Sequence, residues 1–122
     1  MSNPQKILVV EDEEGLRKIF KKYLEPEYEV ILACDGKEGV DLAGEQKPNL
    51  ILLDLRMPKL DGLSVLRLLK MSEKTVEIPV VIISAIGESD SLLDAQLIGA
   101  LDYLIKPFDL ADVRRMVERY IV

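Results

Sequence analysis

The side chains that could do chemistry stand at the ends of short apolar segments. Glu11 and Asp12 follow the first segment, and Asp54 follows the third. Ser84 closes the fourth segment, and Lys106 follows the fifth. Carboxylates brought to one place repel one another and raise one another's pKa unless a cation lies among them. We therefore expect a divalent metal ion between Glu11, Asp12 and Asp54.

The available donor atoms favour a hard cation. The chain has no histidine and a single cysteine, Cys34, so it lacks the imidazole and thiolate ligands that usually bind zinc. Oxygen ligands alone favour Mg²⁺, which keeps some of its waters and binds substrate oxygens, and Mn²⁺ could substitute. The lone cysteine also excludes an internal disulfide and fits a reducing, cytoplasmic setting.

A carboxylate, a metal ion and a lysine together suit phosphoryl transfer. A carboxylate can act as nucleophile and form an aspartyl phosphate, while the metal ion and the lysine offset charge on the phosphoryl oxygens. Asp54 is the expected nucleophile because it ends the central segment, and Glu11 and Asp12 are the expected metal ligands. Lys106 would supply a point charge and Ser84 a hydroxyl donor.

The apolar segments that position these side chains are predicted strands. Three of them are continuous Val, Ile and Leu runs, typical of parallel strands buried on both faces, whereas the second and fifth are more mixed and are expected at the edges. The predicted strands are Lys6–Val10, Tyr28–Ala33, Leu50–Leu53, Pro79–Ser84 and Asp102–Ile105.

Segments with helical periodicity lie between and after the strands. Apolar residues at helical spacing begin at Leu16 and continue to a stop at Pro26. The last helix opens after Asp109, a good N-cap residue. The other predicted helices are a stripe from Leu63 to Leu69, weaker patterns over Lys37–Glu45 and Ser91–Ile98, and a stripe from Leu110 to Tyr120.

This alternation of strand and helix predicts one α/β domain over residues 1–122. Right-handed crossovers give a doubly wound five-stranded parallel sheet with helices on both faces. In the flavodoxin-like strand order 2-1-3-4-5, the first and third strands are neighbours, and ligands bind beyond their carboxyl ends. The second strand, which ends without a comparable reactive group at Ala33-Cys34-Asp35, would then be the outer one.

Composition argues against several classes of function. The 122 residues carry a net charge of -6, which repels polyanions, so no direct nucleic-acid partner is expected. No apolar run approaches the roughly 20 residues that span a bilayer, so membrane insertion is not expected. Neither GxxxxGK[ST] nor GxGxxG occurs, which argues against a nucleotide or flavin site.

At the same positions, the sequence resembles the receiver domains of two-component response regulators. The resemblance spans nearly the whole chain and implies a phosphorylation-activated signalling switch with no output domain in this chain, rather than an enzyme. It rests on the ordered motifs Val10-Glu11-Asp12-Glu13, Leu53-Asp54-Leu55-Arg56-Met57-Pro58, Asp61-Gly62, Ile83-Ser84-Ala85 and Lys106-Pro107-Phe108.

The resemblance implies roles for the acidic residues. Asp54 would accept a phosphoryl group from a histidine kinase or a histidine phosphotransfer protein, which fits a chain that has no histidine of its own. Asp12, Asp54 and the Arg56 backbone carbonyl would bind Mg²⁺, with Glu11 in support. Phosphorylation would then alter the surface between the fourth and fifth helices for a downstream protein or output domain.

The resemblance also implies contacts to the phosphoryl group and a switch. Ser84, which stands where the family commonly has threonine, and Lys106 would contact the phosphoryl oxygens. Movement of Ser84 would let the switch aromatic, Tyr103, turn inward. The Lys106–Pro107 bond is often cis in the family, and Gly62 lies where the loop is expected to require a positive φ.

Two charged surfaces are candidates for partner binding. The first predicted helix carries a basic face that would dock the phosphodonor protein, namely Arg17, Lys18, Lys21 and Lys22. Acidic and basic residues near the fourth and fifth helices either complement each other in a phosphorylation-dependent homodimer or are solvated charges, namely Asp90, Asp94, Arg114, Arg115 and Arg119.

Other interpretations stay open at this stage. A Mg²⁺-dependent phosphotransferase or phosphatase acting on small substrates could also use an aspartyl phosphate, although Asp54-Leu55-Arg56 lacks the second acid of a DxD motif. A receiver that serves only as a scaffold is the other alternative. Five further acidic residues are interpreted as helix, cap or turn residues, namely Glu13, Glu14, Asp35, Asp61 and Asp109. Cys34 is interpreted as a half-buried packing residue.

Overall fold

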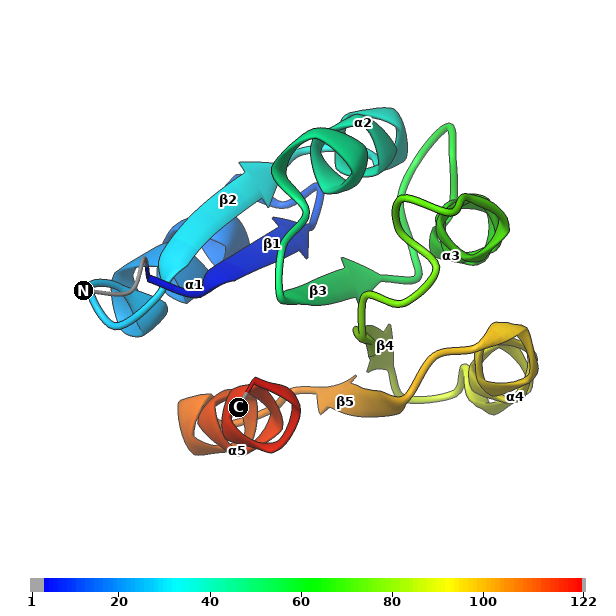
Figure 1. Ribbon diagram of the computed structural model, residues 1–122. Coiled ribbons are helices and arrows are strands. Elements are labelled where there is room, and N and C mark those ends of the chain that lie inside the picture. Colours follow the sequence, from blue (N-terminus) through cyan, green and yellow to red (C-terminus); the bar gives the residue numbers. More distant parts are fainter. Residues whose placement is uncertain (1–3, 122) are drawn as a thin grey trace.

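Five parallel strands form one sheet in the order β2-β1-β3-β4-β5 in the computed structural model, which describes residues 4–121 (Figure 1). This confirms the predicted doubly wound α/β fold and its strand order, with the mixed second and fifth strands at the edges. The strands are β1 (Lys6–Val10), β2 (Glu29–Ala33), β3 (Leu50–Asp54), β4 (Val80–Ala85) and β5 (Asp102–Lys106).

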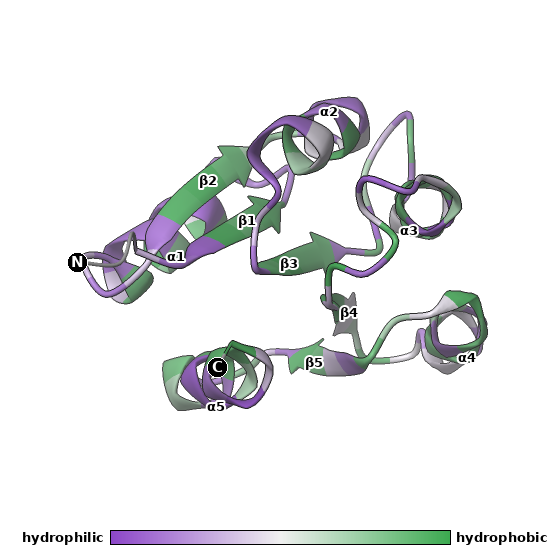
Figure 2. Cartoon of the chain, in the orientation of Figure 1, coloured by the Kyte–Doolittle hydropathy of each residue, from purple (hydrophilic) through white to green (hydrophobic). Residues whose placement is uncertain are grey.

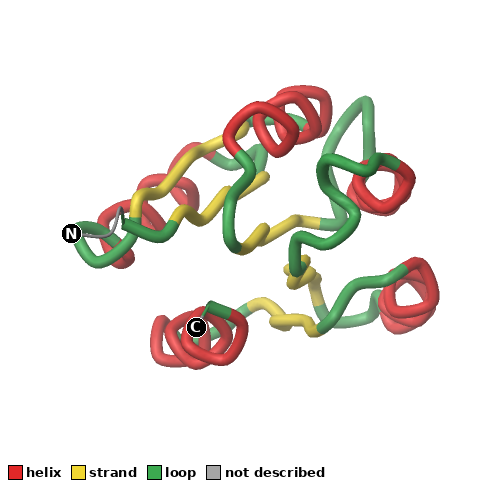
Figure 3. Tube along the Cα trace, in the orientation of Figure 1, coloured by secondary structure: helices red, strands yellow, loops and turns green. Residues whose placement is uncertain are grey.

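Each strand is followed by a helix, and a loop connects the two (Figure 3). Asp35 and Asp61 cap two of them, because their side chains accept the N–H groups of Glu38 and Ser64, both at 2.8 Å. These contacts confirm the interpretation of both aspartates as cap residues. The helices are α1 (Glu14–Leu24), α2 (Gly36–Gln46), α3 (Gly62–Met71), α4 (Ser89–Ile98) and α5 (Leu110–Tyr120).

The helices cover both faces of the sheet. Helices α1 and α5 pack on one face and α2, α3 and α4 on the other (Figure 1). Every residue of β3 is buried, and the strands are the most continuously hydrophobic part of the chain in Figure 2. Burial on both faces explains why β1, β3 and β4 read as unbroken Val, Ile and Leu runs. No helix among residues 4–121 is long and apolar enough to span a membrane.

Gly62 is required for a different reason from the one predicted. Among residues 4–121, positive φ values belong to Lys47, Lys59, Gly87 and Gly99, so the expectation for Gly62 was wrong. A Cβ at Gly62 would instead lie 2.4 Å from the Asp54 carbonyl oxygen and 2.5 Å from the Leu55 Cα. The first residue of α3 therefore packs directly on the end of β3.

Two further expectations can be compared with the structure. The Lys106–Pro107 bond is cis, as the resemblance implied. Cys34 is exposed, so the expectation of a half-buried packing residue was wrong. The reason is its place just beyond β2, which is an edge strand that ends before this residue.

Candidate functional site

Three carboxylates converge where β1 and β3 end. Val10 and Leu53 are paired in the parallel register, so the residues that follow them lie side by side. Carboxylate oxygens of Glu11, Asp12 and Asp54 lie within 4.8 Å of one another. Glu11 is 1% exposed and Asp54 4% exposed, whereas Asp12 is exposed to solvent. The cluster thus has a buried floor and an open side.

Lys106 provides a positive charge beside the two buried carboxylates. Its Nζ lies 3.5 Å from both Glu11 Oε1 and Asp54 Oδ2. The lysine is on β5, so its side chain crosses the end of β4 to reach the carboxylate on β3. The strand order and the length of the lysine side chain together bring these groups, far apart in the sequence, into contact.

Burial changes the proton affinities of this cluster. The pKa of Glu11 is raised to about 7, mainly by burial and also by the charge of Asp54, which together outweigh the opposite effects of the Glu13 N–H and of Lys106. Burial also raises the pKa of Asp54 in spite of the nearby Lys106. For Lys106, burial alone would lower the pKa, but Asp54 and Glu11 outweigh it and raise the pKa. Lys106 therefore does not offset the burial of the two carboxylates, and a divalent cation would stabilise their charged forms.

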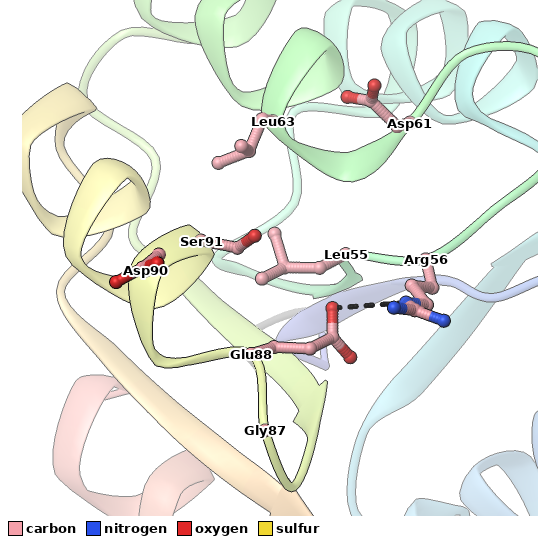
Figure 4. Close-up of a pocket in the computed structure, with 8 residues that line it drawn as sticks. All are labelled: Leu55, Arg56, Asp61, Leu63, Gly87, Glu88, Asp90 and Ser91. Atoms are coloured by element: carbon pink, nitrogen blue, oxygen red, sulfur yellow. Dashed lines mark ion pairs between the residues drawn. The ribbon is translucent and has the colours of Figure 1, made fainter.

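Arg56 contacts Asp54 through its main chain and Glu88 through its side chain. Its N–H donates to Asp54 Oδ1 at 3.2 Å. Its guanidinium Nε lies 3.5 Å from Oε2 of Glu88 in the loop that precedes α4 (Figure 4). The backbone of Arg56 is thus adjacent to the acidic cluster, where the resemblance places its carbonyl.

Ser84 and Tyr103 are positioned differently from the acidic cluster. Ser84 is 1% exposed on β4, and its hydroxyl donates to the Ala85 carbonyl oxygen at 3.2 Å. Tyr103 is 42% exposed on the edge strand β5. The structure therefore brings Glu11, Asp12, Asp54 and Lys106 together. In the part of the chain that the structure describes, no hydrogen bond joins the three acids to Ser84 or Tyr103.

The basic face of α1 is partly paired within the helix. Lys18 contacts Glu14 at 2.9 Å, and Lys21 contacts Glu25 at 2.8 Å. Arg17 donates to the Glu11 carbonyl oxygen at 2.8 Å and so links α1 to the acidic cluster.

The arginines of α5 also bind acids of their own chain. Arg114 pairs with Glu27, Arg115 with Asp112 and Arg119 with Asp102. Arg114 also lies over the Tyr23 ring, 5.1 Å from its centre. These pairs satisfy the arginines without Asp90 or Asp94 and therefore favour the interpretation of this region as solvated charge.

The sequence interpretation missed Glu88. Its carboxylate accepts the Ala85 N–H at 2.9 Å in addition to its contact with Arg56. Glu88 also lines a groove of about 360 Å³ between the loop after β3 and the start of α4 (Figure 4). Its place in the loop at the carboxyl end of β4, four residues after Ser84, was the available signal.

The fold and the acidic cluster define a doubly wound α/β protein with its site at the carboxyl ends of β1 and β3. The response regulator receiver domain family matches residues 7–118 of the chain. The chain therefore belongs to the receiver domains of two-component response regulators, and phosphorylation-dependent signalling is the function of this class.

Sequence similarity to individual proteins supports this membership. The chain is 32% identical to sporulation initiation phosphotransferase F of Bacillus subtilis over 118 residues, covering 96% of this chain and 94% of that protein. It is 39% identical to the DNA-binding dual master transcriptional regulator RpaA of Synechocystis over 119 residues. That match covers 93% of this chain but 49% of RpaA, so the chain spans about half the length of this relative.

Solved structures show the same fold. The receiver domain of sensor histidine kinase PA1611 from Pseudomonas aeruginosa, which has a magnesium ion in its active site cleft, is 32% identical. It superposes with a TM-score of 0.88 and covers 98% of both chains. The chemotaxis protein CheY4 of Vibrio cholerae superposes with a TM-score of 0.91 at 23% identity, covering 98% of this chain and 100% of that protein, and supports the fold.

Proposed function

We propose that Asp54 accepts a phosphoryl group from a histidine kinase or a histidine phosphotransfer protein in a Mg²⁺-dependent reaction. The observation that carries the proposal is a buried Asp54 carboxylate that contacts Lys106 and lies within one cluster with Glu11 and Asp12. A nucleophile, ligands for a hard cation and a fixed positive charge are what phosphoryl transfer to a carboxylate requires.

The residues present fit a magnesium ion. Three carboxylate oxygens within 4.8 Å of one another, two of them from residues whose pKa is raised by burial, form an oxygen-rich site in which, among residues 4–121, Lys106 is the one cation paired with the buried acids. Glu11, Asp12, Asp54 and the Arg56 carbonyl would hold the ion, and Mn²⁺ could substitute. When bound, it would neutralise charge on the carboxylates and on the phosphoryl oxygens.

The groups of the chain then divide the work of transfer. The Asp54 carboxylate attacks phosphorus, so an O–P bond forms while the N–P bond of the donor imidazole breaks. The Lys106 ammonium group, which pairs with the Asp54 carboxylate before transfer, then pairs with the phosphoryl oxygens. The Ser84 hydroxyl turns from the Ala85 carbonyl to donate to a phosphoryl oxygen, which the small side chain allows by rotation about χ1.

Movement of Ser84 would couple phosphorylation of Asp54 to a conformational change at Tyr103 on β5. Tyr103 would turn from its exposed position toward the space that Ser84 leaves, and the surface of α4, β5 and α5 would change for a partner. This surface contains exposed apolar side chains, including Leu93 and Leu97. The chain would thus act as a cytoplasmic switch rather than as an enzyme acting on small substrates.

The partners follow from the same proposal. A histidine kinase or phosphotransfer protein would dock on the basic face of α1, beside the site. A downstream protein, an output domain or a second copy of the chain would bind the surface of α4, β5 and α5. We propose no direct contact with nucleic acid, since the net charge is -6.

Intact mass spectrometry tests the proposal. The protein is incubated with Mg²⁺ and acetyl phosphate, beside Asp54→Asn and a sample with EDTA. We expect one added phosphoryl group in the wild type and none in either control. Addition to Asp54→Asn, or addition that does not depend on the metal, would overturn the assignment of Asp54 or of the metal.

A further inference from the structure

The Glu88 carboxylate is held by two donors at the edge of the site, and Figure 4 shows its ion pair with one of them, Arg56. Its Oε1 accepts the Ala85 N–H at 2.9 Å, and its Oε2 lies 3.5 Å from Arg56 Nε. The Glu88 side chain is 10% exposed, whereas that of Arg56 is 81% exposed. A backbone N–H and a guanidinium that converge on one carboxylate form an anion-binding position.

The Ala85 N–H points toward the side of β4 on which Asp54 lies. Leu55 N–H donates to the Ile83 carbonyl at 3.0 Å, so the backbone groups of Ile83 face β3. Backbone groups of alternate residues in a strand point to the same side. The Ala85 N–H therefore also points toward β3, beyond the last residue of that strand, where it meets Glu88 instead of a strand partner.

Lys106 and Arg56 place this anion position beside Asp54. Ala85 is in register with Lys106, whose Nζ reaches across β4 to Asp54 Oδ2. The Arg56 N–H donates to Asp54 Oδ1, while the guanidinium of the same residue contacts Glu88. A phosphoryl group on Asp54 would extend from this carboxylate into the region that these donors surround.

We propose that Glu88 occupies an anion position that a phosphoryl oxygen takes over when Asp54 is phosphorylated. The inference rests on the proposed function and assigns Glu88 as an internal competitor of the phosphoryl group. One N–H cannot donate a strong hydrogen bond to two anions at once, so Glu88 leaves Ala85 as the phosphoryl oxygen arrives. Glu88 directly precedes α4, and its release therefore changes the start of the helix that carries the exposed leucines.

The affinity for a phosphoryl analogue tests the competition. Beryllium trifluoride, which binds an aspartate as a tetrahedral phosphoryl analogue, is titrated in Mg²⁺ into the wild type, Glu88→Gln and Asp90→Asn. Asp90→Asn is the matched control, because Asp90 lines the same groove and the substitution removes the same charge. We expect Glu88→Gln to bind the analogue about tenfold more tightly, the factor for one charge-assisted hydrogen bond. Asp90→Asn should change the affinity by no more than about twofold, since exposed charges are screened.

The Ala85 amide resonance reports whether Glu88 really leaves. Without the analogue, this resonance should differ between the wild type and Glu88→Gln, because the acceptor differs. At saturation the two resonances should coincide, because both amides then donate to the analogue. A merely structural role for Glu88 would not make them converge.

The outcomes separate the inference from the function on which it rests. Unchanged or weaker binding by Glu88→Gln, equal tightening by Asp90→Asn, or Ala85 resonances that stay different at saturation would overturn the role of Glu88 and leave the proposed function standing. A wild type that neither binds the analogue nor gains a phosphoryl group from acetyl phosphate would overturn both.

Discussion

Replacing Glu11 by glutamine should change how the stability of the metal-free protein depends on pH. Burial raises the pKa of Glu11 from 4.5 to about 7. Between these two values the folded state binds a proton that the unfolded state does not bind. The stabilising contribution of Glu11 is therefore fully present below pH 4.5 and is lost as the pH rises through 7.

The magnitude follows from the difference in pKa. Each pH unit of difference corresponds to about 1.4 kcal/mol, so the complete loss amounts to about 3 kcal/mol. Screening by water reduces this free-energy difference only slightly, because Glu11 is 1% exposed. Glutamine keeps the shape of the side chain but does not titrate, so the Glu11→Gln variant should lack this loss.

Urea unfolding in EDTA between pH 5 and pH 8 measures the effect. We expect the free energy of unfolding of Glu11→Gln, relative to the wild type, to rise by about 2–3 kcal/mol across this range. Glu14→Gln is the control, since Glu14 is an exposed acid near the start of α1, and it should leave the pH profile of the wild type unchanged. Parallel profiles for the wild type and Glu11→Gln would refute the assignment of a raised pKa to Glu11. With saturating Mg²⁺ the stability lost above pH 7 should return, because metal ligation requires the deprotonated carboxylate.

Three further predictions concern packing, docking and phosphoryl lifetime. Gly62→Ala should lower the free energy of unfolding by about 2 kcal/mol or more in urea, because its Cβ meets the backbone at 2.4 Å; an unchanged midpoint would contradict this contact. Reversing Lys18 and Lys21 to glutamate should slow transfer from a protein phosphodonor by roughly tenfold and leave acetyl phosphate unaffected, and equal slowing with both donors would exclude a docking role. Arg56 and Ile86 stand two residues after Asp54 and Ser84, where a long or bulky side chain would hinder the attacking water, so Arg56→Asn and Ile86→Ala should shorten the half-life of the phosphorylated protein; a half-life that stays at the wild-type value would oppose this explanation.

The fold and the acidic cluster followed from the sequence because they depend on strand topology. Continuous apolar runs marked β1, β3 and β4, the alternation of strands and helices predicted that they run parallel, and the flavodoxin-like order adopted for them is the one observed. Once that order is known, residues at the carboxyl ends of neighbouring strands must be adjacent. The grouping of Glu11, Asp12 and Asp54 follows from this adjacency, whereas Lys106 joins them because its long side chain reaches across the end of β4.

Features that depend on side-chain conformation and close packing were not predictable in the same way. The partners of Arg56 and Arg114 are Glu88 and Glu27, which are distant from them in the sequence, and no sequence pattern selects these two acids from the others in the chain. The sequence showed that Gly62 lies in a loop before a helix, but both a positive φ and a close backbone contact demand glycine. Only coordinates distinguish the two.

The path of Lys106 has a consequence for the dynamics of the site. Lys106 is the last residue of β5, which is an edge strand and is paired with β4 alone in the described sheet. Edge strands open locally at a lower free-energy cost than the centre of a sheet, and amide hydrogen exchange measures that cost. Each such fraying event would withdraw the ammonium group from Asp54 while the carboxylates on β1 and β3 stayed in place. Opening of β5 is therefore one route by which the acidic cluster loses the ammonium group of Lys106, and its free-energy cost is read from the exchange protection of β5 rather than from that of the central strands.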